Sequence, residues 1–189
     1  MTFAEAMIEV RKTSSHTALS DEEARVLYDA MAGLQSQDFV IEIGSQLGRS
    51  SVLITQMALS RGFHSIHVDP FCEQDVWAHD FIKRMCEVRS DRDRAFTFLC
   101  MRTDQARDIL DQLHPIQLIY VDGDHTYAGV KTDLEFARVN LVEGGYLLCH
   151  DYGRESLPDV YKAVSEFLSV NPDFTLVAHE GTMGCWRRG

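Results

Sequence analysis

The pattern of apolar and polar positions predicts strands and helices that alternate along most of the chain. Short apolar runs, typical of buried strands, occupy residues 39–44, 65–69, 95–101, 116–122 and 144–151. Segments with helical spacing of apolar residues follow them, at residues 50–61, 75–90, 104–113, 126–140 and 157–170. Ser20 and Glu23 have the spacing of a capping box, which predicts a further helix before the first strand. Two runs near the end, at residues 174–179 and 184–188, are typical of a β-hairpin.

This order of elements predicts an α/β fold. Strands that are apolar throughout are typical of parallel sheets covered by helices on both faces. We therefore expect a Rossmann-like, doubly wound, mainly parallel sheet of seven strands that ends in an antiparallel hairpin. The 189 residues fit one domain, with residues 1–35 as an N-terminal helical segment and residues 36–189 as the core.

Polar residues and a glycine mark the points where the predicted strands end. They are Glu42, Gly44, Asp69, Asp104, Asp122, His150 and Asp151. In parallel α/β sheets, ligands bind at the carboxyl ends of the strands, beside the point where the strand order reverses. The sequence therefore predicts a functional site at this edge of the sheet.

Composition narrows the range of partners. The net charge is −11 and the basic clusters are short, which argues against nucleic acid. No apolar run approaches the roughly 20 residues of a membrane span, and residues 1–12 lack the apolar core of a signal peptide. The five cysteines show no C-x-x-C pairing, which is typical of reduced thiols in a cytoplasmic protein. A homodimer stays an open alternative to a monomer.

The stretch VIEIGSQLGRSS, residues 40–51, contains a glycine-rich turn between a predicted strand and helix. Arg49 and the glycine spacing exclude a P-loop, and Gln46 stands where a dinucleotide fingerprint needs a glycine. The stretch resembles the E-x-G-x-x-x-G turn of class I S-adenosylmethionine-dependent methyltransferases. In this resemblance the turn glycines are Gly44 and Gly48, and the Glu42 carboxylate meets the cationic methionine moiety.

Asp69 ends the second predicted strand, 25 residues after Gly44, where an acid can accept hydrogen bonds from both ribose hydroxyls. NAD sites use the same geometry, so Asp69 indicates a ribose and leaves the cofactor open. The methyltransferase resemblance places Asp104 at the adenosine end. It implies cofactor contacts at Glu42, Gly44, Gly48, Ser50, Asp69 and Asp104.

The fourth and fifth predicted strands end in VDGDH and LLCHDY. This combination resembles the metal-dependent small-molecule O-methyltransferases, a branch that includes sugar and catechol-type enzymes. The resemblance implies methyl transfer from S-adenosylmethionine to a hydroxyl of a small acceptor. It also implies a divalent cation, Mg²⁺ or Mn²⁺, held by Asp122, Asp151 and His150, of which His150 replaces a ligand that is commonly acidic or amide.

Asp124 and His125, which follow Asp122, are both candidates for the catalytic base. An imidazole with a pKa near 6.5 suits proton removal at neutral pH better than a carboxylate with a pKa near 3.9. His125 is therefore the predicted base, and Asp124 is the alternative. Asp124 and Thr126 also fit a purely structural role as caps of the following helix.

Two other functions stay open on the sequence. Tyr127 and Lys131 have the Tyr-x-x-x-Lys spacing of NAD(P)-dependent short-chain dehydrogenases, although no partner serine lies a dozen residues earlier. A Rossmann-like protein that binds a nucleoside without catalysis is the second alternative. For the acceptor pocket, we expect residues 69–80, with Phe71 and Trp77, to form a border and residues 14–17 to fold over the cofactor.

Overall fold

The computed structural model describes residues 1–13, 19–70, 75–88 and 96–189, within which fourteen helices and strands are defined. The strands are β1 (Phe39–Ile43), β2 (His64–Val68), β3 (Phe96–Leu99), β4 (Ile116–Val121), β5 (Leu141–Cys149), β6 (Phe174–Glu180) and β7 (Met183–Arg188). The helices are α1 (Phe3–Thr13), α2 (Asp21–Met31), α3 (Arg49–Arg61), α4 (Asp75–Val88), α5 (Thr103–Leu110), α6 (Tyr127–Asn140) and α7 (Pro158–Val170).

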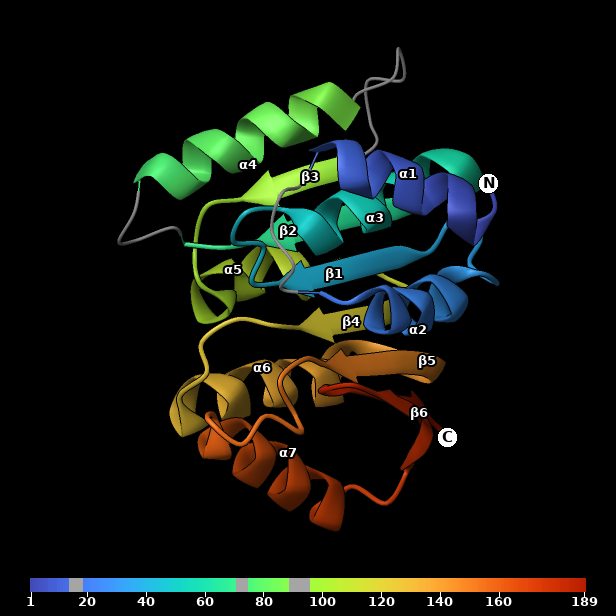
Figure 1. The fold of residues 1–189 in the computed structure, drawn as a ribbon. Coiled ribbons are helices and arrows are strands. Elements are labelled where there is room, and N and C mark those ends of the chain that lie inside the picture. Colours follow the sequence, from blue (N-terminus) through green and yellow to red (C-terminus); the bar gives the residue numbers. More distant parts are fainter. Residues whose placement is uncertain (14–18, 71–74, 89–95) are drawn as a thin grey trace.

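The strands form one sheet in the order β3-β2-β1-β4-β5-β7-β6 (Figure 1). Strands β1 to β5 are parallel to one another, and β7 pairs antiparallel with both β5 and β6. The strand order reverses between β1 and β4, which is where such sheets bind ligands. The predicted Rossmann-like fold with a C-terminal antiparallel hairpin is confirmed.

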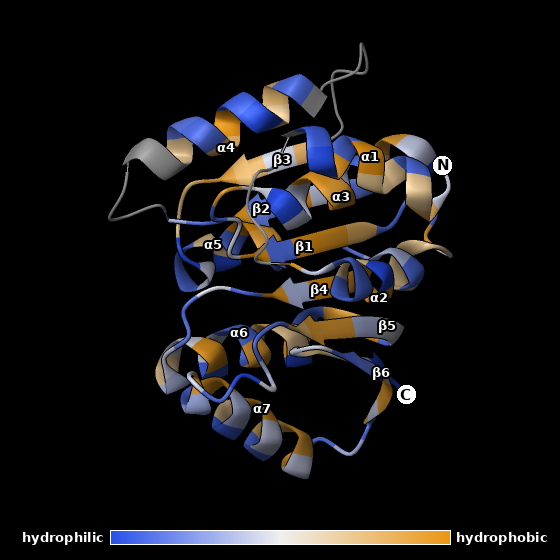
Figure 2. Ribbon diagram, in the orientation of Figure 1, coloured by the Kyte–Doolittle hydropathy of each residue, from blue (hydrophilic) through white to orange (hydrophobic). Residues whose placement is uncertain are grey.

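Helices cover both faces of the sheet, so the sheet lies between two apolar layers. On one face, residues of α1 to α4 such as Leu53 and Met57 pack against Leu118 and Tyr120. On the other face, residues of α5 to α7 such as Phe136 pack against Ile41, Ile119 and their neighbours. Figure 2 shows apolar central strands such as β1 between helices whose outer sides are hydrophilic, whereas the edge strand β6 is more hydrophilic. The alternate direction of side chains along each strand explains why these strands are apolar at nearly every position.

Strand β5 begins at Leu141, three residues before the predicted start at residue 144. Gly144 has φ +81°, and the register of β4 with β5 shifts between Ile116 and Leu118. The irregularity lets the strand pass through two glycines that a sequence pattern assigns to a turn. No helix among the described residues is long and apolar enough to span a membrane.

The turn after β1 brings two backbones into close contact. Gly44 has φ +88°, and its N–H donates to the Val68 carbonyl at 2.8 Å. A Cβ atom at Gly44 would overlap the backbone carbonyl of Asp122, at the end of β4. Gly48, the N-cap of α3, has φ +84°, and a Cβ there would lie 3.0 Å from the Phe81 ring. Both positions therefore require glycine for conformation and for space.

We expect Gly44→Ala to lower the free energy of unfolding by about 2 kcal/mol or more, because it adds backbone strain and a collision with the β4 backbone. Urea denaturation at pH 7 measures this loss. Gly33→Ala is the matched control, because a Cβ there meets nothing within 4 Å, and its change should stay within about 0.5 kcal/mol. Equal stability of the two variants would contradict the close contact.

Candidate functional site

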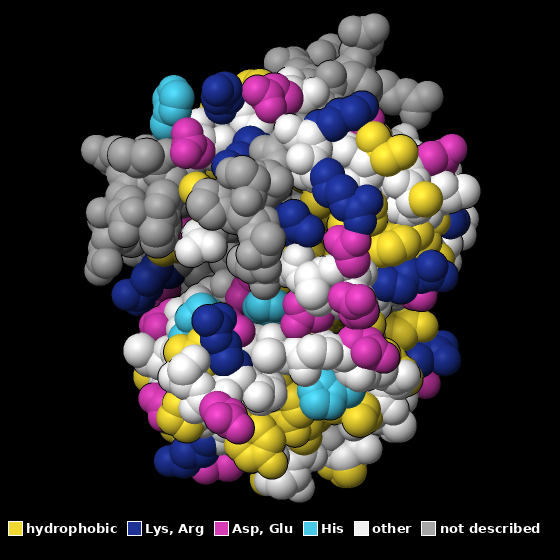
Figure 3. Space-filling view, viewed as in Figure 1, with side chains coloured by type: hydrophobic (Ala, Val, Ile, Leu, Met, Phe, Trp, Pro, Cys, Tyr) yellow, Lys and Arg dark blue, Asp and Glu magenta, His cyan; other side chains and the backbone are white. Residues whose placement is uncertain are grey.

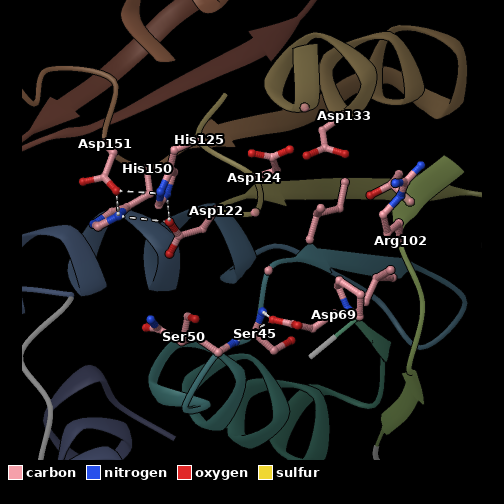
Figure 4. Close-up of a pocket in the computed structure, with 18 of the residues that line it drawn as sticks. Ser45, Ser50, Asp69, Arg102, Asp122, Asp124, His125, Asp133, His150 and Asp151 are labelled. Atoms are coloured by element: carbon pink, nitrogen blue, oxygen red, sulfur yellow. Dashed lines mark hydrogen bonds and ion pairs between the residues drawn. The ribbon is translucent and has the colours of Figure 1, made fainter. Parts of the chain in front are cut away.

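A cavity of about 870 Å³ lies at the carboxyl ends of β1, β2, β4 and β5, where the predicted site residues meet. Asp and His side chains line the cavity, and Figure 3 shows acidic and His side chains near the middle of this face. In Figure 4, Asp122, His125, His150 and Asp151 converge at one end, and Arg102 and Asp133 lie toward the other. Between the two ends, Ser45 and Asp69 approach from the glycine turn and β2.

The glycine turn is held from the cavity side by Asp69. Its Oδ2 atom accepts hydrogen bonds from the backbone N–H groups of Ser45 and Gln46, both at 2.8 Å. The structure thus places Asp69 beside Gly44, Gly48 and Ser50, and all four line the cavity. This is the arrangement that the ribose prediction for Asp69 requires, and the contact with ribose itself remains a prediction.

Asp104 also lines the cavity but is exposed, and it forms an ion pair with Arg102. The hydrogen bond from Arg102 lowers the pKa of Asp104, so the carboxylate is ionised. Its predicted contact with the adenosine end is compatible with this position and remains untested.

Glu42 differs from the other predicted cofactor residues because it does not line the cavity. Its side chain is fully buried beneath the turn. Oε2 lies 2.6 Å from His67 Nδ1 and accepts hydrogen bonds from the hydroxyls of Ser45 and Ser51. In this position Glu42 fixes the glycine turn from below. A direct contact between Glu42 and the methionine moiety, as the resemblance implies, remains a prediction.

Asp122, His125 and Asp151 form a cluster at the end of the cavity nearest β5. One ligand-type atom from each residue lies within 4.8 Å of those of the other two. His125 Nε2 lies 3.2 Å from Asp151 Oδ2 and 3.6 Å from Asp122 Oδ1, and it is buried without an aligned hydrogen bond in the described part of the chain. Asp151 has φ +58°, a left-handed conformation that is uncommon for a residue other than glycine.

This set differs from the predicted metal ligands, because it contains His125 where the sequence suggested His150. Two carboxylates and an imidazole nitrogen have the chemistry of a divalent cation site. The residues present therefore fit a metal. The pKa of His125 is raised by Asp122 next to it, which reflects the negative charge of the cluster.

His150 lies beside this cluster with carboxylates on both sides of its ring. Nδ1 lies 3.3 Å from Asp122 Oδ1 and 3.6 Å from Asp151 Oδ2. Nε2 lies 3.5 Å from Glu23 Oε2. Burial by itself lowers the pKa of His150, but the three carboxylates outweigh burial and raise it to about 12. These contacts favour the imidazolium form of His150, whose positive charge offsets part of the negative charge of the three carboxylates.

Asp124 is not brought to the cluster. Its Oδ1 accepts from the Thr126 N–H at 2.9 Å, and its Oδ2 accepts from the Thr126 hydroxyl at 3.0 Å. Thr126 in turn caps α6 through Gly129. The structure thus gives Asp124 a structural role, because it holds the N-cap residue Thr126, and its role as a base remains an untested alternative.

A family model described as a methyltransferase domain matches residues 41–152, which is more than half of the chain. The chain belongs to this methyltransferase family. The match spans the glycine turn, Asp69, Asp104 and the cluster, and it confirms the resemblance that the motifs suggested. No curated protein sequence matches the methyltransferase.

Solved structures share the fold over nearly the whole chain. The O-methyltransferase from Bacillus cereus in complex with SAH has a TM-score of 0.70 and 15% identity, covering 98% of this chain and 90% of that chain. The O-methyltransferase TomG from Streptomyces achromogenes, in complex with SAM, has a TM-score of 0.67 and 15% identity, and the match covers 99% of this chain and 89% of that chain. A TDP-rhamnose 3'-O-methyltransferase of calicheamicin biosynthesis has a TM-score of 0.67 and 13% identity, and the match covers 97% of this chain and 93% of that chain. At these identities the likeness concerns the fold.

The remaining predictions concern the dehydrogenase-like pair of Tyr127 and Lys131 and the borders of the acceptor pocket. Tyr127 and Lys131 do not line the cavity, and the Tyr127 hydroxyl donates to Glu166 at 2.5 Å. The dehydrogenase-like pair is therefore not assembled at the site. Residues 14–17 and Phe71 lie outside the described residues, as does the side chain of Trp77.

Sequence analysis missed the contribution of Glu23 to the site of the methyltransferase. Glu23 was recognised as half of a capping box with Ser20, and that box is present. The same carboxylate also accepts from the Thr182 N–H at 2.8 Å and faces His150. Burial raises the pKa of Glu23, but its contacts outweigh burial and hold the pKa well below the ordinary value. No sequence pattern links residues 23, 150 and 182, so no local signal predicts this junction.

Glu23→Gln tests the junction, because glutamine keeps one acceptor oxygen for the capping box, removes the charge that faces His150 and places an NH2 group opposite the Thr182 donors. We expect the free energy of unfolding at pH 7 to fall by about 1–3 kcal/mol, the cost typical of a lost charged hydrogen-bonding partner. Ser20→Ala is the control, since it weakens only the cap and should cost about 1 kcal/mol. Urea denaturation compares the variants. Wild-type stability in Glu23→Gln would show that the carboxylate contributes only as a cap.

Proposed function

We propose that the methyltransferase transfers a methyl group from S-adenosylmethionine to a hydroxyl of a small acceptor molecule. One observation carries this proposal: a single cavity joins the glycine turn with Asp69 to the cluster of Asp122, His125 and Asp151. The first part suits an adenosyl cofactor, and the second suits activation of a hydroxyl. SAH and SAM bound to the Bacillus and Streptomyces structures support the cofactor.

In this proposal, the residues at the two ends of the cavity determine the direction in which the cofactor binds. Asp69 accepts hydrogen bonds from the ribose hydroxyls, and the turn at Gly44 allows the cofactor to lie close to the backbone. In this proposal the adenosine lies near Asp104, which the resemblance implies and which pairs with Arg102. The sulfonium end then points toward the cluster, which lies at the opposite end of the cavity from Arg102 (Figure 4). The acceptor hydroxyl lies between the sulfonium methyl and the cluster.

The reaction is an in-line displacement. A lone pair of the acceptor oxygen attacks the methyl carbon while the bond from carbon to sulfur breaks. Its electrons remain on sulfur, so the sulfonium becomes a neutral thioether. The proton of the hydroxyl passes to His125, whose Nε2 is buried and has no aligned hydrogen bond in the described residues. Positioning of acceptor and cofactor in one cavity supplies much of the rate.

Asp122 and Asp151 would hold a divalent cation in this site. When bound, a cation lowers the pKa of an acceptor hydroxyl and fixes its oxygen. His125 also has the geometry of a third ligand, which is the alternative to its role as base. His150 is the other candidate for the third ligand, because its Nδ1 lies 3.3 Å from Asp122 Oδ1 and 3.6 Å from Asp151 Oδ2.

The acceptor belongs to the small-molecule class in this proposal, as a sugar or a phenol-like metabolite. The TDP-rhamnose 3'-O-methyltransferase with the same fold supports a sugar hydroxyl as one candidate. The exposed Arg154, which donates to Asp151 at 3.1 Å and lines the cavity, suits an acceptor with an anionic group.

S-adenosylhomocysteine should stabilise the protein by roughly 2.7 kcal/mol at a concentration of about 100 times its Kd, because it binds only the folded state. NAD(H) and NADP(H) should leave the melting temperature unchanged. Thermal unfolding with each compound measures the shift, and Asp69→Ala should reduce it strongly. A shift with a nicotinamide cofactor alone would instead favour the dehydrogenase alternative. Binding of the adenosyl compound without transfer to any hydroxyl acceptor would favour the non-catalytic binding protein.

Mn²⁺ should bind to the wild-type protein in calorimetric titration, and Asp151→Asn should abolish this binding because it removes a charged ligand. Asp108→Asn, on the exposed side of α5 and outside the cavity, is the control and should bind as the wild type does. EDTA should abolish methyl transfer and leave S-adenosylhomocysteine binding intact. Full activity in EDTA would contradict the metal site.

His125→Gln separates the two roles of this imidazole. If His125 is the base, kcat should fall at least about a hundredfold, the usual contribution of a general base, while Mn²⁺ affinity is unchanged. If His125 is a ligand, Mn²⁺ affinity should fall together with kcat.

A further inference from the structure

The hydroxyl of Tyr120 lies inside the protein and reaches one side of the cluster. Tyr120, on β4, is fully buried, and its ring packs in the apolar layer that α1 to α4 form against the sheet. Its hydroxyl donates a hydrogen bond to Asp122 Oδ2 at 3.2 Å. Phenylalanine would fill the same layer without a polar atom, and a buried hydroxyl is unfavourable unless it finds a partner. Tyr120 therefore needs an explanation beyond packing.

The geometry of β4 explains why Tyr120 and Asp122 meet. Residues two positions apart on a strand project to the same face of the sheet. Asp122 directly follows β4, so its side chain continues the row of Leu118 and Tyr120. On the neighbouring β5, Leu148 pairs in register with Tyr120, and His150 follows two positions later. Tyr120 thus lies in the row beneath the cluster, one step before Asp122 and His150.

The contacts of Asp122 are divided between its two oxygens. Oδ2 accepts from the Tyr120 hydroxyl, whereas Oδ1 lies 3.3 Å from His150 Nδ1 and 3.6 Å from His125 Nε2 (Figure 4). One oxygen is thus held from beneath the cluster, and the other faces the two imidazoles. A carboxyl group turns about its last torsion with little restriction unless a contact fixes it. The buried hydroxyl supplies that contact.

Asp151 shows the same division, but its outer contact is exposed. Arg154 donates to Asp151 Oδ1 at 3.1 Å, and Oδ2 lies 3.2 Å from His125 Nε2. The Arg154 side chain is 55% exposed, so water and salt weaken its pairing with Asp151. The hydroxyl of Tyr120 is enclosed, because this residue has no exposed surface. Of the two outer contacts, that of Tyr120 therefore fixes its carboxylate more firmly.

We propose that Tyr120 is a positioning residue, which holds Asp122 so that Oδ1 alone is offered to a divalent cation. This step rests on the proposed function, in which Asp122 and Asp151 hold the cation. Partners that hydrogen-bond to ligating carboxylates orient them, and loss of such a partner typically costs roughly 10–100-fold in metal affinity. Without the hydroxyl, Oδ2 would lack this donor and the carboxyl group could turn away from the cluster. Tyr120 acts through Asp122 and contacts neither cofactor nor acceptor in this role.

Calorimetric titration with Mn²⁺ tests this role in Tyr120→Phe, which removes the hydroxyl and keeps the buried ring. We expect the Kd for Mn²⁺ to rise by about tenfold or more, because Asp122 is no longer held toward the cluster. Tyr28→Phe is the matched control, since it removes a hydroxyl that donates to the Met1 carbonyl at 2.8 Å, away from the cavity. This control should bind Mn²⁺ as the wild type does.

S-adenosylhomocysteine provides the readout that separates positioning from a general loss of structure. Neither tyrosine lines the cavity, so both variants should bind this compound with the wild-type Kd and remain folded in thermal unfolding. Wild-type Mn²⁺ affinity in Tyr120→Phe would overturn the proposal, as would an equal loss of affinity for Mn²⁺ and for S-adenosylhomocysteine. Failure of the wild type to bind Mn²⁺ would instead remove the proposed metal site, and the role of Tyr120 with it.

Discussion

The contact between the turn after β1 and the end of β4 is the constraint on which the site depends. Gly44 lies so close to the Asp122 carbonyl that no side chain fits between them. This contact joins the residues that face the cofactor to the strand that carries the cluster. With a larger residue at Gly44 the two strand ends would separate. The cavity lies where these two neighbouring parallel strands end, beside the point at which the strand order reverses.

Charge is the second constraint at the end of the cavity near β5. Asp122 and Asp151 meet there, and like charges at such short distance destabilise the folded chain unless cations compensate. His150 compensates as an imidazolium, and Glu23 faces the other side of its ring. Helix α2 is thereby tied to the site by charge as well as by packing. The fit of the cluster to a divalent cation follows from the same excess of carboxylate.

The carboxyl groups in and below the cavity wall have different roles because their surroundings differ. Asp69 receives two backbone hydrogen bonds from the turn, and Glu42 is enclosed below it with His67. Asp124 holds the N-cap residue of α6, whereas Asp133 is buried with little compensation. Residues of one type thus support the glycine turn, a helix N-terminus and the cavity wall. Their chemistry is determined by burial and by the donors that each one meets.

The sequence by itself determined the strands and helices, the sheet class and the glycine turn, because these depend on periodicity and on residues a few positions apart. It also identified Asp69, Asp122 and Asp151 correctly as neighbours of one cavity, since parallel strands bring their carboxyl ends to one edge. The tertiary structure alone decided which way each side chain points. It buried Glu42 under the turn and brought His125 as well as His150 to the two carboxylates. It also brought Glu23 to Thr182, 159 positions away, because such contacts depend on how whole elements pack and leave no trace in local spacing.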